Sequence, residues 1–202
     1  MTNAFSTKPT LRLASRLPAL TRETGVSAVE IALLLGCGAL ATAMVGFVHL
    51  RMGVPGHAIL RAAIPMAMGF AFVPRRAAGM IMTVGAGLTC VAMSAVRVGM
   101  FQPAAMLSLL LLGPVLDFAL LGDPKGWRLY ARFITGGAAA NLLAYLVKLA
   151  TVSLGWSAGG GRNFTAFGPT ALLSVLLCGA LAGLISAALW FRLGATDDLR
   201  RN

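Results

Sequence analysis

Six long apolar segments, separated by short polar turns, make up most of the chain. They cover residues 26–48, 58–73, 77–96, 103–121, 127–154 and 168–191. A helix of about 20 apolar residues spans the hydrocarbon core of a bilayer, and these segments approach or exceed that length. We therefore predict an all-α membrane protein, folded as a compact bundle of about six transmembrane helices.

The polar segments set the expected domain limits. Residues 1–25 are interrupted by basic residues and should remain as a cytoplasmic tail, residues 26–192 form the transmembrane domain, and residues 193–202 form a second tail. Pro65 lies inside the second segment, and a proline breaks one helical hydrogen bond. That segment is therefore expected to kink or to enter the membrane only in part.

Composition supports a lipid environment. Of the 202 residues, 58% are hydrophobic and 11% are charged, and the mean hydropathy is +0.83, whereas a soluble domain has about 25% charged residues. The net charge of +11 would suggest nucleic acid in a soluble protein. Here the basic residues lie in short runs between apolar segments, so we expect a lipid bilayer and no nucleic acid as the partner.

The distribution of Lys and Arg orients the bundle. With six spans, twelve of the seventeen basic residues fall on the side that holds both tails, four fall on the other side, and Lys148 lies within a span. Cytoplasmic loops carry the excess of positive charge. We expect both termini to be cytoplasmic, in a multi-pass protein of a bacterial inner membrane.

The corner after the first segment collects polar side chains on the predicted outer side. His49, Arg51 and His57 lie within nine residues of one another. They are candidate ligand-binding residues of a substrate-facing loop. His49 and His57 are also candidate ligands of a soft or borderline metal ion. The alternative is that both histidines sit at the membrane interface and support a turn.

A polar stripe is expected on the fifth helix. Asn141, Tyr145 and Lys148 follow one another at spacings of four and three, so they share one helical face. They are candidates to line an outward ligand cavity together with His49, Arg51 and His57, which we name the histidine corner. In the alternative reading, Asn141 bonds a neighbouring helix and Lys148 extends to the interface.

Two acids lie within apolar segments. Asp117 is late in the fourth segment, and a carboxylate in hydrocarbon needs a partner or water. We expect an ion pair with Arg128 or Arg132 near the cytoplasmic face. Glu30 begins the first segment and is expected to pair with a basic loop residue.

Small residues recur at a spacing of four in two segments. Ala28, Ala32 and Gly36 lie in the first, and Gly179 and Gly183 lie in the last. This spacing lets helices approach closely. Such motifs serve internal packing by default, whereas an exposed copy would dock a partner membrane subunit.

Motifs of catalysis are missing from the sequence. It contains no Walker A loop, no HExxH, no CxxC pair and no nucleophile elbow. A lipid-modifying enzyme would have to use Asp117, His49 and His57, which are expected near opposite faces of the membrane. We therefore predict that the chain is not an enzyme and holds no cofactor beyond a possible metal ion.

Three runs resemble a known transporter family. They are Gly53-Val54-Pro55-Gly56-His57-Ala58-Ile59-Leu60-Arg61, Pro74-Arg75-Arg76-Ala77-Ala78-Gly79 and Leu112-Gly113-Pro114-Val115-Leu116-Asp117. They are similar to the substrate-binding S components of energy-coupling factor (ECF) transporters, including the cobalt/nickel subunits. The resemblance implies an outward cavity for a vitamin or metal ion, and a transmembrane coupling subunit and two ATPases as partners.

The resemblance also implies where the partner docks. Small residues on the first helix are the family's usual docking surface, and Ala28, Ala32 and Gly36 are the matching positions. The cobalt/nickel subunits ligate metal with a histidine at the extreme N-terminus. This chain begins Met1-Thr2-Asn3, which leaves the histidine corner as the substitute.

The expected function is that of a substrate-binding membrane subunit of an ECF/ABC-type importer, which captures a vitamin-like small molecule or metal ion from the outer side. The alternative is a non-catalytic accessory or scaffold subunit of a larger membrane complex. An exposed small-residue or Met-rich face without an internal cavity would be typical of the scaffold.

Overall fold

The chain folds into six helices in a computed structural model that describes residues 27–48, 56–98, 103–122, 126–154 and 168–191. Within these ranges there is no strand. The helices are α1 (Ala28–Phe47), α2 (Ala58–Phe72), α3 (Ala78–Ala95), α4 (Pro103–Ala119), α5 (Trp127–Ser153) and α6 (Pro169–Trp190). The prediction of an all-α fold is confirmed over these residues, and each of the six helices begins and ends within two residues of an expected segment.

Local sequence signals explain where the first and last helices begin. The Ser27 hydroxyl accepts a hydrogen bond from the Glu30 amide at 3.2 Å, and the Glu30 carboxylate accepts one from the Ser27 amide at 2.9 Å. This reciprocal capping box satisfies two backbone donors at the start of α1. At the start of α6, Pro169 occupies the first turn, where its missing N–H is not needed.

Two helices continue through an internal proline. Pro65 lies within α2, which remains one helix over Ala58–Phe72, and Pro114 lies within α4. Pro114 lacks the N–H that would bond the Leu110 carbonyl, and the Thr83 hydroxyl of α3 donates to that carbonyl at 3.4 Å. A neighbouring helix thus supplies the donor that the proline lacks, as apolar surroundings require.

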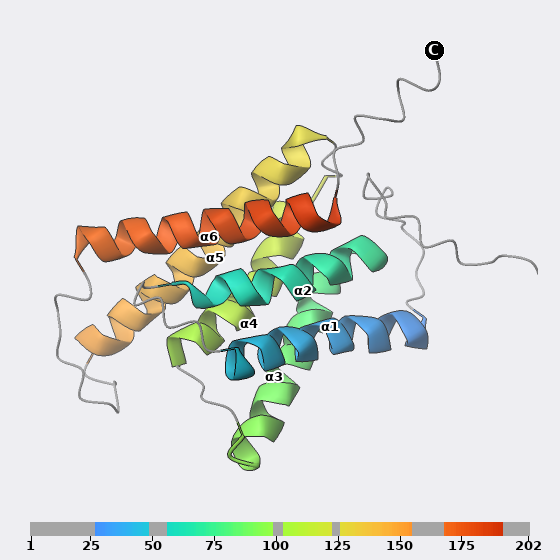
Figure 1. Ribbon diagram of the computed structural model, residues 1–202, viewed down its shortest axis with the longest axis horizontal. Coiled ribbons are helices and arrows are strands. Elements are labelled where there is room, and N and C mark those ends of the chain that lie inside the picture. Colours follow the sequence, from blue (N-terminus) through green and yellow to red (C-terminus); the bar gives the residue numbers. More distant parts are fainter. Residues whose placement is uncertain (1–26, 49–55, 99–102, 123–125, 155–167, 192–202) are drawn as a thin grey trace, which may run out of the picture.

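The helices pack as a closed ring in the order α1, α3, α4, α5, α6, α2. In Figure 1, α1, α2 and α6 run side by side, and α2 lies between the other two. α2 also touches α3, α4 and α5, which makes it the most central helix. In keeping with this central position, most residues of α2 are buried, and α2 is the shortest of the six helices.

Successive helices run in opposite directions, so the bundle has two distinct ends. At one end, named here the Glu30 end, the start of α1 contacts the α2–α3 turn, and the start of α5 contacts the ends of α4 and α6. These contacts are Glu30–Arg75, Arg132–Ala119 and Tyr130–Phe191. At the other end, named the Gly56 end, Gly56 and Arg61 at the start of α2 contact Asn141 of α5 and Val45 of α1.

Four helices, α1, α3, α5 and α6, are long and apolar enough to cross a membrane, and α2 and α4 are apolar but shorter. Outward-facing side chains of α3 and α6 are mainly apolar, as a lipid-facing surface requires. They include Val84, Leu88, Val91, Leu173 and Leu177. The fold is therefore that of a multi-pass membrane protein.

Candidate functional site

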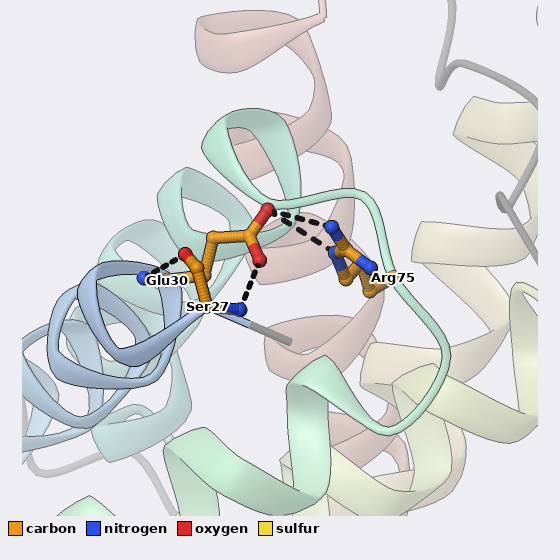
Figure 2. A network of polar contacts seen from close by, with 3 residues as sticks. All are labelled: Ser27, Glu30 and Arg75. Carbon is orange, nitrogen blue, oxygen red and sulfur yellow. Dashed lines mark hydrogen bonds and ion pairs between the residues drawn. The ribbon is translucent and has the colours of Figure 1, made fainter. Parts of the chain in front are cut away.

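An ion pair fixes the start of α1 to the turn between α2 and α3. Arg75 contacts one carboxylate oxygen of Glu30 through Nη2 at 3.0 Å and through Nε at 3.1 Å, while the other oxygen accepts from the Ser27 amide (Figure 2). The predicted pairing of Glu30 with a basic loop residue is confirmed. Because Glu30 belongs to both the capping box and the ion pair, it sets where α1 begins and how that end is held.

The predicted ion pair of Asp117 is wrong. Its two oxygens accept hydrogen bonds from the backbone amides of Gly79 at 2.9 Å and Met80 at 2.8 Å. These amides belong to the first turn of α3, where Ala77 provides no side-chain cap. The positive end of a helix dipole favours a carboxylate. Asp117 of α4 therefore caps α3 from a neighbouring helix.

Arg132, the other expected member of that pair, is used elsewhere. Its guanidinium donates to the carbonyls of Ala119 and Leu121 at the end of α4. Carbonyls at a helix C-terminus lack intrahelical partners and favour a cation. Arg128 is exposed at the start of α5 and forms no ion pair with Asp117. Asp117 thus binds backbone amides at the start of α3, and Arg132 binds backbone carbonyls at the end of α4. The two side chains do not pair with each other.

A pocket of about 230 Å³ lies at the Glu30 end, beside Asp117. Its wall is mainly apolar, and its polar members come from the α2–α3 turn and α4. The lining residues are Phe70, Arg75, Arg76, Ala77, Met80, Asp117, Phe118, Leu120 and Leu121. The sequence predicts a ligand cavity beside Asn141, whereas this pocket lies at the opposite end of the bundle.

Asn141 is 1% exposed and joins four parts of the fold. Its Nδ2 donates to the carbonyls of Gly56 at 3.2 Å and Val175 at 2.8 Å, and its Oδ1 accepts from the Ser108 hydroxyl at 3.1 Å. Gly56 has a φ of +84°, and an added Cβ would lie 2.6 Å from Nδ2 of Asn141. The structure thus brings Asn141 to the residue beside His57, in a tightly packed contact between helices.

The other predicted binding residues are spread along this end. His57 occupies the N-cap position of α2 without a side-chain capping bond, and it is half-buried. Tyr145 is half-buried and Lys148 is exposed, so the α5 stripe runs from the core to the surface. His49 and Arg51 lie outside the described residues. Within the described ranges, no group of three His, Cys, Asp or Glu side chains comes together as a metal site, and the metal and ligand roles stay predictions.

The two small-residue motifs have opposite surroundings. Gly179 and Gly183 of α6 face α5, where a Cβ on Gly179 would lie 2.5 Å from the Gly137 carbonyl oxygen and one on Gly183 would overlap the Phe133 carbonyl. By contrast, Ala28, Ala32 and Gly36 of α1 are exposed, and no heavy atom lies within 4 Å of the position of a Cβ on Gly36. The first motif holds the bundle together, and the second has none of the six described helices against it.

Arg61 is a buried polar residue that the sequence pattern does not mark as a site. It lies four positions after the N-cap of α2 and is 9% exposed. Its Nη1 donates to the Val45 carbonyl at 3.4 Å, and its buried Nε has no hydrogen-bond partner among the described residues. The signal in the sequence is a single charge placed one turn inside an apolar segment.

Comparison of this chain with protein-family models, with curated proteins and with solved structures found no match.

Proposed function

We propose that the chain is a substrate-binding membrane subunit of an ECF/ABC-type importer in a bacterial inner membrane. It would capture a vitamin-like small molecule or metal ion on the outer side and would not itself be an enzyme. The observation that supports this proposal is the exposed small-residue face of α1. We name Ala28, Ala32 and Gly36 the α1 face.

The two sides of α1 differ in what they contact. On the inner side, Gly38 packs so closely on α3 that a Cβ there would overlap the Met82 carbonyl. On the outer side, the α1 face is open along more than two helical turns. A surface of small residues allows a second helix to approach the backbone closely and gain van der Waals contact. The α1 face therefore suits docking to a transmembrane coupling subunit.

The position of the α1 face also suits a subunit that works with ATPases. It covers the first half of α1, next to the Glu30–Arg75 pair. The excess of Lys and Arg favours the Glu30 end as the cytoplasmic side, with both termini there. A coupling subunit docked on the α1 face would be held closer to cytoplasmic ATPases than to the outer surface.

A second candidate is a non-catalytic accessory or scaffold subunit. The contact set of Asn141 favours it, because all three hydrogen bonds go to other parts of this chain. The side chain proposed to face a ligand is thus engaged in helix packing. Both candidates require the α1 face as a docking surface, and they differ in whether a ligand and ATPases are present.

The test is purification of the full chain with its native lipids from its own membranes. Mass spectrometry would identify the proteins and small molecules that accompany it. We expect a second membrane subunit, two ATPases and a bound small molecule or metal ion. Gly36→Leu should lose the protein partners, while Ala139→Leu, the same kind of change at an exposed position of α5, should keep them.

The outcomes separate the two candidates. Membrane partners without ATPases and without a ligand would favour the accessory subunit. Preparations that contain the chain alone, with neither partner nor ligand, would contradict both proposals. Partners that remain with Gly36→Leu would show that docking uses another surface.

A further inference from the structure

Arg61 holds a positive charge inside the bundle with only one of its donors used. The guanidinium has five N–H donors and remains charged. The single bond, from Nη1 to the Val45 carbonyl, is long at 3.4 Å, and the buried Nε is unpartnered among the described residues. Capping the end of α1 explains that one bond. It does not explain the remaining donors or the charge.

A buried charge without a counter-charge is costly, and a charged residue in a membrane helix is expected to have a partner. The two acids in the described part of the chain cannot serve Arg61. Glu30 is paired with Arg75, and Asp117 caps α3. Both lie at the Glu30 end. Val45 follows Glu30 by fifteen residues of one helix, which is about 22 Å along its axis.

The sequence on either side of Arg61 contains no acid over a long stretch. No Asp or Glu occurs between Glu30 and Asp117, or between residues 124 and 196. The remaining acids lie in the segments before α1, between α4 and α5, and after α6, outside the described residues. They are Glu23, Asp123, Asp197 and Asp198. Within the described part of the chain, Arg61 therefore has no counter-charge.

The start of α2 adds to the positive potential around Arg61. Side chains in a helix point back toward its N-terminus, so Arg61 is directed to the first turn of α2. The N-terminus of a helix presents backbone amides and a partial positive charge, which favour an anion.

We propose that Arg61 and the first turn of α2 form a binding site for an oxyanion, a carboxylate or a phosphate. The planar guanidinium fork matches both groups and can donate two parallel hydrogen bonds to either. The anion comes from a soluble small molecule or from a lipid headgroup. The proposal does not depend on the importer function, because it rests on the burial of Arg61 and on the absence of acids in the intervening sequence.

The test is the thermal stability of the full chain in nanodiscs of phosphatidylcholine. Phosphate and acetate are titrated against chloride at constant ionic strength, and a parallel sample contains phosphatidylglycerol. We expect at least one oxyanion source to raise the Tm, by about 5–10 °C at a hundredfold excess over its Kd. A response to soluble anions identifies a small-molecule site, and a response to phosphatidylglycerol alone identifies a headgroup site.

Variants assign the response to Arg61. Arg61→Met should abolish the anion-dependent rise and should leave the Tm without oxyanion equal to or above that of the unchanged protein, because the uncompensated charge is gone. Arg97→Met, at an exposed arginine of the same end, should keep the full rise. The proposal is overturned if no oxyanion source raises the Tm of the unchanged chain, or if Arg61→Met responds as that chain does.

Discussion

Two helices of this protein carry the same spacing of small residues with different consequences. On α6, Gly179 and Gly183 lie against the backbone of α5, and neither position has room for a methyl group. On α1, Ala28, Ala32 and Gly36 face outward, and the Gly36 position has open space around it. The spacing alone therefore does not say whether a motif builds the bundle or remains for a partner.

The difference teaches that the opposing surface decides the role of a small-residue motif. α5 offers Gly137 at the crossing, so both backbones approach and the glycines become obligatory. α1 meets its own neighbour α3 through Gly38 and Gly85, which leaves the α1 face uncovered by the described part of the chain. Matched substitutions at the two motifs should consequently affect different properties.

The largest effect on the fold should come from Gly183→Ala. The added Cβ would overlap the Phe133 carbonyl, so α5 and α6 would have to move apart. Overpacking of this kind costs about 1–3 kcal/mol, which corresponds to a Tm lower by roughly 2–12 °C for a protein of this size. Thermal unfolding in detergent, followed by helical circular dichroism, measures it.

The matched control is Gly36→Ala, the same substitution on α1. It should leave the Tm unchanged or slightly higher, because alanine favours a helix by about 1 kcal/mol over glycine and the position is open. Equal destabilisation by both substitutions would contradict the contrast between the motifs.

The largest effect on association should come from Gly36→Leu. A leucine would fill the α1 face and keep a partner helix at a distance, while the fold of the chain stays intact. We expect the complex with the membrane partner to weaken about tenfold to a hundredfold, as a steric cost of about 1–3 kcal/mol implies. Quantitative co-purification at several protein concentrations measures it.

Ala139→Leu is the reference for this change, since it adds similar bulk at an exposed site of another helix. Neither variant should lower the Tm, and the two should differ in partner binding. If Ala139→Leu weakens the complex as much as Gly36→Leu, the effect belongs to added bulk in general and the α1 face has no special role.

Asn141→Ala should lower the stability by an amount similar to that of Gly183→Ala, with no effect on association. It would leave the Ser108 hydroxyl and the carbonyls of Gly56 and Val175 without this partner in the core. An unsatisfied buried group costs about 1–3 kcal/mol. The Tm should fall, and association through the α1 face should persist at temperatures where the variant is folded. Normal stability would contradict the helix-joining role of Asn141.

The smallest effect should come from Glu30→Gln. Glutamine can maintain the capping box with Ser27, so this variant removes the charge pair with Arg75 alone. Because both side chains are partly exposed, we expect a loss of at most about 1 kcal/mol, and less at high salt. Glu30→Ala removes the cap as well and should lose more. Chemical denaturation at two salt concentrations compares them, and identical values for the two variants would exclude the cap as a separate contribution.

Hydropathy and charge predicted most of the fold. The six apolar segments predicted the helices to within two residues, and the basic residues in the turns predicted that Glu30 pairs with a basic loop residue, which is Arg75 in the structure. The partners of Asp117 and Arg132 were not predictable in the same way. Both bind backbone groups at helix ends, and such groups have no signature in the sequence.

For the candidate sites, the sequence predicted which residues share a helical face but not which residues they contact. Residues at a spacing of four share a helical face, but which neighbour covers that face depends on the order of helices around the ring. Asn141 contacts Gly56, the residue before His57, and its engagement with Gly56 and Val175 required the fold. The burial of Arg61 likewise depends on how α1 and α2 are packed.

The central claim is that the α1 face contacts another protein within the membrane. Photo-crosslinking in native membranes tests it most directly, with a diazirine-bearing aliphatic amino acid in place of Gly36 and, as the reference, in place of Ala139. We predict a crosslink at position 36 to one membrane protein other than this chain, and lipid adducts at position 139. Lipid adducts alone at both positions, or a crosslink at position 36 only to a second copy of this chain, would contradict the claim.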